Sequence, residues 1–87
     1  MEKKPWFVYI IENVKGHYYT GITTDLARRF KEHSESKKGA KFFFTGGPRT
    51  MVFRKEFPNR SEALKFEFHI KSLNRIQKIK LINENKS

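Results

Sequence analysis

The first part of the chain alternates between apolar runs and a short polar turn. Residues 6–11, WFVYII, are apolar at both alternating positions and rich in aromatic and β-branched types, as is typical of a strand covered on both faces. Asn13 and Lys15-Gly16 then form a turn signal, and strand character returns over residues 18–22. The pattern predicts a hairpin over residues 6–22 whose first strand is central in a sheet.

A polar break after the hairpin introduces the first predicted helix. Three consecutive residues are candidate N-caps, because their side chains can accept hydrogen bonds from the first helical turn: Thr23, Thr24 and Asp25. The helix is expected to reach about residue 35. Residues 36–50 are basic and contain glycines, so this stretch is predicted to be a loop.

The remainder of the chain predicts one more strand and two more helices. Residues 51–57, MVFRKEF, have strand chemistry, and Pro58-Asn59 then begins a helix that covers residues 61–73. Asn74 and Gln77 form a candidate capping box for a last helix. Beyond about residue 83 the chain is polar, and we expect that tail to be frayed.

Length and composition limit the chain to one small domain. With 87 residues it lies below the usual domain size of roughly 100–150 residues, so residues 1–87 are expected to form a single unit with its core over residues 6–82. Nine phenylalanines help so short a chain bury enough apolar area to fold.

The absence of cysteine and of long apolar segments narrows the possible classes further. No disulfide framework, thiolate zinc site or cysteine nucleophile is possible, and the composition fits a reducing compartment. The N-terminal apolar run has six residues and no cleavage site, and no segment approaches the roughly 20 apolar residues of a membrane span. We therefore expect a cytoplasmic monomer that does not bind membranes.

Positive charge is the strongest signal in the composition. The chain has 19 lysines and arginines against 9 acidic residues, for a net charge of +10. Such an excess favours a polyanionic partner, because each phosphate that is neutralised releases condensed counterions. No long amphipathic basic helix of the membrane-surface type is present. We therefore expect nucleic acid as the partner.

Helical angles distinguish the two adjacent arginines of the first helix. Leu26 and Phe30 mark its buried stripe, and Arg29 and His33, four residues apart, border that stripe. Arg28 points to solvent. Arg29 is thus directed toward the hairpin, either as a functional group or as a side chain whose stem covers the core.

The second long helix contains an acidic residue in an unusual position. Its inner stripe passes through Ala63, Phe66, Ile70 and Leu73, with Leu64 and Phe68 on the other flank. Glu67 falls between these groups. A carboxylate among apolar positions requires an ion pair, hydrogen bonds or a metal, so Glu67 is a candidate metal ligand or one half of a buried salt bridge. Because acids are scarce, a two-metal site built from several carboxylates is not expected.

Two further groups of residues are candidates for function. Tyr9 and Tyr19, ten residues apart, lie on the two strands of the hairpin and are potential cross-strand neighbours. The loop combines aromatic rings at residues 42–44 with basic side chains that can bind phosphates, or else its rings fill the core and its charges are only solvated. The basic residues of this group are Lys37, Lys38, Lys41 and Arg49.

Taken together, these residues resemble the GIY-YIG nuclease family, and most closely its small stand-alone bacterial members. The resemblance covers residues 6–73 through the segments FVYI, YYTGITTDLARRFKEH, GAKFFFT and SEALKFEFHIK. Its specificity comes from the joint spacing of its elements. The elements are Tyr9, Tyr19-Thr20-Gly21, Arg29, His33 and a glutamate in the next long helix, Glu67.

The resemblance implies an α+β fold, with a three-stranded antiparallel sheet flanked by about three helices. It also implies cleavage of DNA backbones with one divalent cation, Mg²⁺ or Mn²⁺. By position, Tyr9 and Tyr19 match the two motif tyrosines. Arg29 matches the arginine that stabilises the phosphate charge, and Glu67 matches the metal-binding glutamate. His33 occupies a position that is histidine or tyrosine in the family. The general base remains open among Tyr9, Tyr19 and His33.

The sequence differs from the family pattern in places that leave its functional side chains intact. The first element is Phe7-Val8-Tyr9, and the second is Tyr-Thr-Gly. Several members carry an asparagine after the glutamate; Asn74 is the nearest here, but its spacing is short and its capping role accounts for it. Two functions follow as hypotheses: a metal-dependent, structure-selective endonuclease, and a non-catalytic binder of DNA or RNA on the same fold.

Overall fold

The computed structural model of the chain describes residues 4–13, 15–34 and 48–85, and of residues 32–34, 48 and 49 it describes the backbone alone. Three strands and three helices follow one another along the chain. Their bounds are β1 Trp6–Asn13, β2 Tyr18–Thr23, α1 Leu26–Ser34, β3 Pro48–Phe57, α2 Arg60–Ser72 and α3 Arg75–Asn85. The strands form one antiparallel sheet, so the expected α+β class is confirmed.

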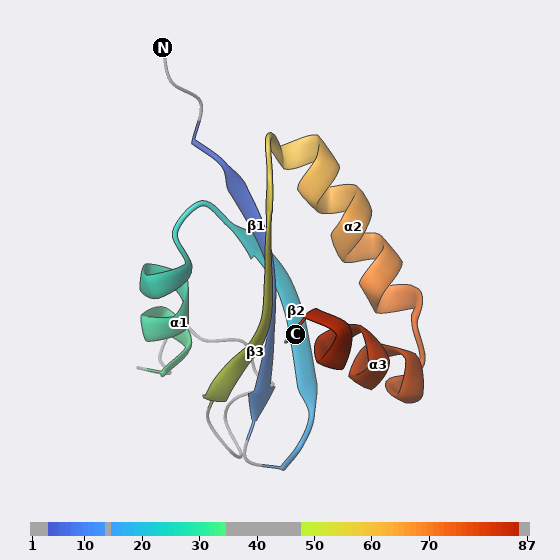
Figure 1. The fold of residues 1–87 in the computed structure, drawn as a ribbon. Helices are drawn as coiled ribbons and strands as arrows, with labels where there is room; N and C mark the ends of the chain where they lie inside the picture. The colour runs from blue at the N-terminus through green and yellow to red at the C-terminus, as the bar shows by residue number, and fades with distance from the viewer. Residues whose placement is uncertain (1–3, 14, 35–47, 86–87) are drawn as a thin grey trace.

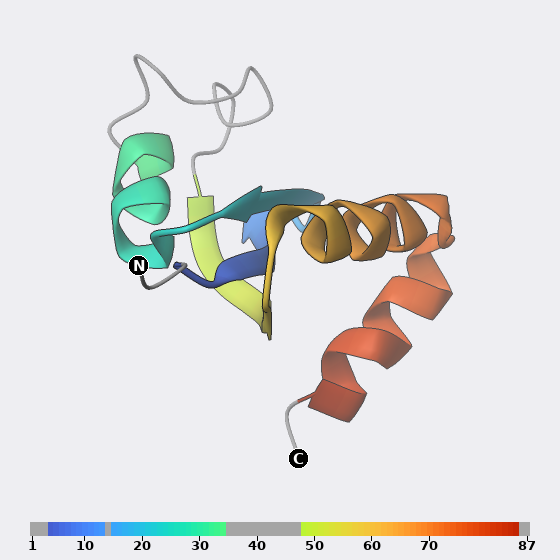
Figure 2. The same cartoon turned by 90° about the horizontal axis from the view of Figure 1, so that it is seen from above.

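The sheet has the order β2-β1-β3, which confirms β1 as the central strand. Helix α1 lies on one face of the sheet, and α2 and α3 lie on the other (Figure 1). The view from above shows the same three layers (Figure 2). A strand covered on both sides needs apolar residues at every position, which explains why residues 6–11 lack a polar alternation.

Alternate residues of β1 enter two separate hydrophobic cores. Val8 and Ile10 belong to the larger core, together with Phe53, Ala63, Ile70 and Ile82 from the other elements. On the opposite face, Tyr9 and Ile11 pack against half-buried residues of the remaining elements: Tyr19, Leu26, Phe30 and Met51. The predicted buried stripe of the first helix is thereby confirmed, and α1 is fixed over the tyrosine face.

The hairpin turn is closed by a buried asparagine. Asn13 is 1% exposed, and its Oδ1 accepts hydrogen bonds from the backbone N–H groups of Lys15 and His17 at 3.0 and 2.9 Å. Gly16 has a φ of +83°, a left-handed conformation that glycine adopts without strain. Arg75 donates a hydrogen bond to the Gly16 carbonyl at 3.0 Å and so connects α3 to this turn.

Capping side chains begin each helix. Of the three candidates before α1, Asp25 is the cap: its Oδ1 accepts from the Arg28 N–H at 3.0 Å. Asn59 accepts from the Glu62 N–H at 2.9 Å at the start of α2. Asn74 and Gln77 form the predicted capping box, with reciprocal bonds of 2.8 and 3.0 Å.

Three details of the sequence prediction were wrong. Strand β3 begins at Pro48 rather than residue 51, because β1 continues to Asn13 and its last residues pair with residues 48–50. Helix α3 continues to Asn85, past the expected start of a frayed tail, since Ile82 is 4% exposed and anchors its last turns. Phe68, expected to flank the buried stripe of α2, is 67% exposed.

None of the helices in the described part of the chain has the length and apolar character of a membrane span.

Close packing between Gly21 and Tyr9 sets the shape of the tyrosine face. The two residues are direct partners on β2 and β1. A Cβ atom at Gly21 would lie 2.5 Å from the Tyr9 Oη and 2.7 Å from its Cζ, far inside van der Waals contact. The ring therefore lies across β2 in space that only a glycine leaves open. Glycine is required here by this contact, because Gly21 has an ordinary backbone conformation.

We predict that Gly21→Ala destabilises the protein by about 1–3 kcal/mol, the usual cost of forcing extra volume into a packed core. Urea denaturation would measure the free energy of unfolding. The loss should shrink in a Tyr9→Leu background, which lacks the atoms that the new methyl group meets. An equal loss in both backgrounds would contradict the assigned contact.

Candidate active site

The candidate site is centred on the phenol of Tyr9. Its side chain is fully buried, and it projects from the central strand toward β2 and α1. The Nε–H of Arg29 donates to its Oη at 3.4 Å, a long hydrogen bond. Because α1 packs over this face, a residue 20 positions away along the chain reaches the phenol.

Tyr19 joins Tyr9 on the same face but not directly opposite it. The register pairs Tyr19 with Ile11 and Gly21 with Tyr9, which makes the two tyrosines diagonal neighbours. Their ring centroids are 6.3 Å apart, and the ring planes are tilted by 38°. Tyr19 is half-buried whereas Tyr9 is closed off from solvent, so Tyr19 is the tyrosine that an outside ligand can reach.

The two adjacent arginines of α1 have different environments, as the helical angles predicted. Arg29 is half-buried and hydrogen-bonded to Tyr9. Arg28 is exposed. This difference is set by Leu26 and Phe30, whose packing on the sheet fixes the rotation of the helix.

Burial and neighbouring charges act in opposite directions on Tyr9. Burial raises the pKa of Tyr9 above its ordinary value of 10.0, and this effect is the largest. The hydrogen bond and positive charge of Arg29 lower it, while Tyr19 and Glu67 raise it. At neutral pH the Tyr9 phenol is therefore protonated.

Glu67 lies on α2 at the border between its buried and exposed faces. Its side chain is 17% exposed, and Oε2 lies 3.4 Å from the Nζ of Lys71 one turn later. Lys71 is itself 58% exposed, so the contact is a partly solvated helix pair and not a buried salt bridge with arginine. The carboxylate thus keeps access to solvent while its charge reaches Tyr9.

The described residues fit a cation bound mainly through water and substrate. Among them, no group of three or more His, Asp or Glu side chains could enclose a metal ion. Mg²⁺ usually keeps several waters and binds through one or two carboxylates plus substrate phosphates. One accessible carboxylate, Glu67, satisfies that requirement, and it is the residue that would hold such an ion.

The remaining predicted site residues fall wholly or partly outside the described part of the chain. His33 lies in α1, one turn after Arg29, and only its backbone is described. Arg49 lies in β3, again with its backbone alone. Lys37, Lys38 and Lys41, together with the aromatic residues 42–44, lie outside the described residues.

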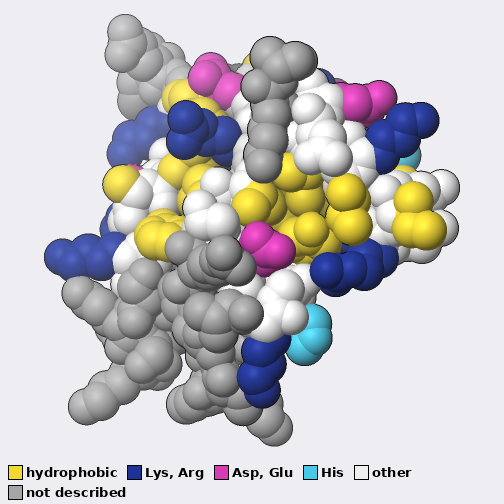
Figure 3. Space-filling view, turned by 60° about the horizontal axis from the view of Figure 1, so that its bottom comes forward, with side chains coloured by type: hydrophobic (Ala, Val, Ile, Leu, Met, Phe, Trp, Pro, Cys, Tyr) yellow, Lys and Arg dark blue, Asp and Glu magenta, His cyan; other side chains and the backbone are white. Residues whose placement is uncertain are grey.

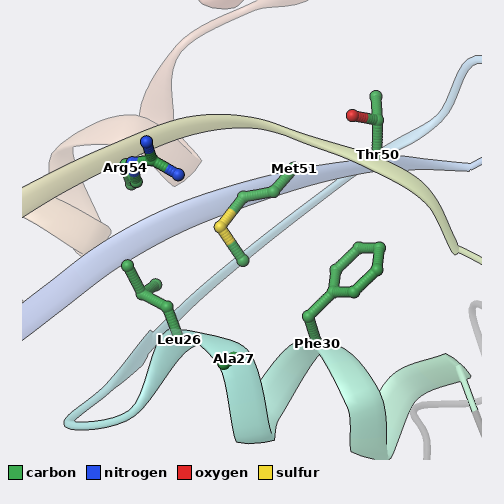
Figure 4. Close-up of a pocket in the computed structure, with 6 residues that line it drawn as sticks. All are labelled: Leu26, Ala27, Phe30, Thr50, Met51 and Arg54. Carbon is green, nitrogen blue, oxygen red and sulfur yellow. The ribbon is translucent and has the colours of Figure 1, made fainter.

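Sequence reasoning missed one basic residue on this face of the sheet. Arg54 of β3 is the direct partner of Tyr9 on the side opposite Gly21, and residues directly opposite each other share a face. Only the strand register reveals this, because nothing in the run MVFRKEF marks Arg54 as special. It lines a hollow of about 530 Å³ between α1 and β3, into which Leu26, Met51 and Phe30 point (Figure 4).

Charge and apolar surface occur together on the outside of the molecule. In the space-filling view, hydrophobic side chains reach the surface in the middle of one face, and lysine and arginine side chains lie along its margins (Figure 3). With a net charge of +10, the surface as a whole attracts anions.

Comparison with known proteins shows the family of this chain. Residues 5–80 match the GIY-YIG catalytic domain. The chain is 45% identical over 80 residues to a UPF0213 protein of Citrobacter koseri. The aligned region covers 92% of this chain and 79% of the relative. A UPF0213 protein of Desulfotalea psychrophila is 43% identical over 81 residues, covering 93% and 74% of the two chains.

A solved structure agrees with the sequence relatives. The solution NMR structure of a UPF0213 protein from Bacillus halodurans aligns with a TM-score of 0.59 and 42% identity, covering 91% of this chain and 83% of that one. The family match over residues 5–80 spans all six elements of the fold, from β1 into α3, and that range includes Tyr9, Tyr19, Arg29, His33 and Glu67. This chain therefore belongs to the GIY-YIG domain family and is similar to its small UPF0213 proteins.

Proposed function

We propose that the protein is a metal-dependent endonuclease that hydrolyses phosphodiester bonds in nucleic acid, with DNA as its substrate. GIY-YIG domains are a nuclease family, which supports the reaction class. The observation that carries the proposal is the convergence on Tyr9. Its ring centroid lies 6.3 Å from that of Tyr19, its Oη accepts a hydrogen bond from Arg29, and the Glu67 carboxylate raises its pKa, so groups from three elements act on it.

Arg29 is the group that stabilises the phosphate in this proposal. The transition state of phosphodiester hydrolysis gathers negative charge on the phosphate oxygens, and a guanidinium can donate to two of them at once. Its Nε–H donates to the Tyr9 phenol, which fixes the orientation of the guanidinium. Tyr9 thus positions the catalytic arginine.

The general base is assigned to Tyr19 or His33. Tyr9 is a poor base because it is buried and its pKa is raised, so deprotonating it near neutral pH is costly. Its protonated phenol instead accepts the hydrogen bond of Arg29 and holds that side chain in place. Tyr19 is more accessible, and the ordinary pKa of a histidine, about 6.5, suits His33 to accept a proton from water.

Glu67 is the proposed ligand for one Mg²⁺ or Mn²⁺ ion. When bound, a divalent cation supplies Lewis-acid stabilisation of phosphate charge. The carboxylate is accessible and its partner Lys71 is largely solvated, so replacing that contact costs little. A single ligand also places few demands on a chain that has only nine acidic residues.

Binding of the substrate is proposed to rest on charge rather than on base sequence. Arg54 shares the face of Tyr9 and is exposed, so it can contact a phosphate near the cleaved bond. Lys37, Lys38, Lys41 and Arg49 are proposed to contact the backbone as well. Phosphate contacts orient the substrate without reading its sequence, so selectivity is expected to follow the structure of the nucleic acid.

Arg29→Ala should lower the cleavage rate by about 10²–10³-fold, the usual loss for one donor that stabilises a transition-state oxyanion. Arg28→Ala removes the same charge from the preceding residue and should change the rate little, because Arg28 is exposed to solvent. Single-turnover cleavage of a plasmid and of a branched DNA would measure both. Equal losses would show that general charge, not position, matters.

Glu67→Gln should abolish metal-dependent cleavage while leaving binding to nucleic acid level or stronger, since it removes one negative charge from a basic protein. The rate should fall by at least about 10²-fold. Glu62→Gln is the matched control, because Glu62 is on the same helix and pairs with Lys65 at 3.8 Å but is 50% exposed. Cleavage with Mg²⁺, with Mn²⁺ and with chelator is the measurement.

Unfolding of Glu67→Gln in urea without metal distinguishes a metal-binding role of Glu67 from a structural one. Breaking the partly solvated pair with Lys71 should change the free energy of unfolding by less than about 1 kcal/mol. A loss of roughly 3–5 kcal/mol, as for a broken buried pair, together with unchanged metal affinity would make Glu67 a structural residue. Wild-type protein that binds nucleic acid yet never cleaves it would instead support the non-catalytic binder.

Affinity for nucleic acid should fall steeply with salt. On duplex DNA the logarithm of the binding constant should drop with a slope of about −0.9 for each phosphate contacted, so about four contacts imply a loss of about 100-fold between roughly 50 and 200 mM salt. Fluorescence anisotropy across a salt series would measure the slope. A flat affinity over that range would contradict a polyanionic partner.

A further inference from the structure

An aromatic ring beside the proposed metal ligand is exposed to solvent. Phe68 follows Glu67 on α2, and its ring is 67% exposed. Among the described residues, the other large hydrophobic side chain with comparable exposure is Ile76 of α3, at 77%. A single exposed apolar residue is common on protein surfaces, so exposure alone carries no argument. The surroundings of Phe68 are what distinguish it.

Phe68 lines a hollow that also contains charged groups. The hollow, of about 520 Å³, is lined by Glu67, Phe68, Lys71 and Ser72, all on the last turns of α2. The Lys71 ammonium is 58% exposed and lies 3.4 Å from the Glu67 carboxylate. An ammonium has three N–H donors, so this contact leaves donors for a further anion. An apolar ring, a cation and the carboxylate of the proposed site thus border one space.

We propose that Phe68 stacks on an unpaired nucleobase next to the cleaved phosphate, while Lys71 contacts a neighbouring phosphate of the same strand. The proposal rests on the proposed function, because Glu67 must lie at the point of cleavage. A strand that passes Glu67 also passes the adjacent Phe68. Alternating phosphates and bases match a site in which a cation and an aromatic ring lie side by side.

The chemistry of the ring selects unpaired bases and ignores sequence. In a continuous duplex both faces of each base are covered by its stacked neighbours, so a surface ring finds no base face to contact. At a single-stranded end, gap or branch point a face is free. Phenylalanine has no hydrogen-bonding group, and every base offers a π-face, so stacking distinguishes paired from unpaired bases without distinguishing one base from another.

Charge favours this occupant over a second copy of the chain. Two chains of net charge +10 repel each other, and the apolar ring stands beside a lysine that would have to be desolvated in a protein interface. A single strand of nucleic acid instead brings anions to that lysine. The hollow therefore suits a polyanion that carries flat apolar groups.

Phe68→Ala is compared with Ile76→Ala, which removes an apolar side chain of similar exposure from another helix. Binding is measured by fluorescence anisotropy in chelator, with a single-stranded oligonucleotide and with a blunt duplex of equal length. Phe68→Ala should weaken binding to the single strand by about 5- to 150-fold, the loss typical of one stacked base, and leave the duplex nearly unchanged. Ile76→Ala should change neither.

Conservative variants and an optical probe check that the contact is stacking. Phe68→Tyr should retain single-strand affinity, whereas Phe68→Leu, which keeps apolar volume without a π-face, should behave like Phe68→Ala. A 2-aminopurine placed along the single strand should change its fluorescence on binding wild-type protein and not on binding Phe68→Ala. If Phe68→Leu kept the single-strand affinity and the 2-aminopurine signal of the wild type, stacking would be overturned.

Each remaining outcome separates this proposal from the proposed function. Equal single-strand affinity of Phe68→Ala and Ile76→Ala overturns the stacking site, even if the wild type cleaves DNA. A shift of the wild type to dimers that Phe68→Ala abolishes, without a change in binding, also overturns it in favour of self-association. Stacking by Phe68 in a protein that never cleaves supports the site and removes the nuclease function.

Discussion

The contact between the Tyr9 ring and Gly21 is the constraint on which the candidate site depends. The ring leaves the central strand and lies across β2, because a residue without Cβ stands beneath it. Its phenol is thereby brought beside Tyr19 and within reach of Arg29. Any other residue at Gly21 would displace the ring, and with it the group that orients the arginine.

Covering the central strand on both faces has a functional consequence. One face of β1 packs against α2 and α3, and the other packs against α1. Helices from opposite layers therefore both border the same hairpin. Arg29 of α1 donates to the Tyr9 phenol, and the Glu67 carboxylate of α2 raises the pKa of that phenol, so a cation and an anion from separate elements act on Tyr9. Neither layer alone would assemble both charges.

The electrostatics of the site follow from the scarcity of acids in a basic chain. Glu67 keeps partial contact with solvent and pairs with a lysine that is itself largely solvated. A carboxylate held in this way is stabilised without being locked into a salt bridge, which suits a group that exchanges partners. Tyr9, in contrast, is closed off, and its raised pKa keeps it neutral. The two groups thus lie in distinct environments, one partly open to solvent and one closed off from it.

Local physical chemistry made much of this protein predictable from its sequence. Uninterrupted apolar character identified β1 as central, and the capping chemistry of Asp25, Asn59 and Asn74 located the helix starts. The helical repeat separated Arg29 from Arg28, and the spacing of the motifs indicated the family. These features depend on residues close in the chain, where periodicity and hydrogen bonding act directly.

The tertiary structure alone decided which distant residues meet. The strand register made Tyr9 and Tyr19 diagonal neighbours and placed Arg54 beside Tyr9. The face of α2 that packs on the sheet left Phe68 exposed and Glu67 partly exposed, although the helical periodicity placed both near the apolar stripe. Strand register and the packed face of a helix result from packing summed over the whole fold, so no short stretch of sequence encodes them.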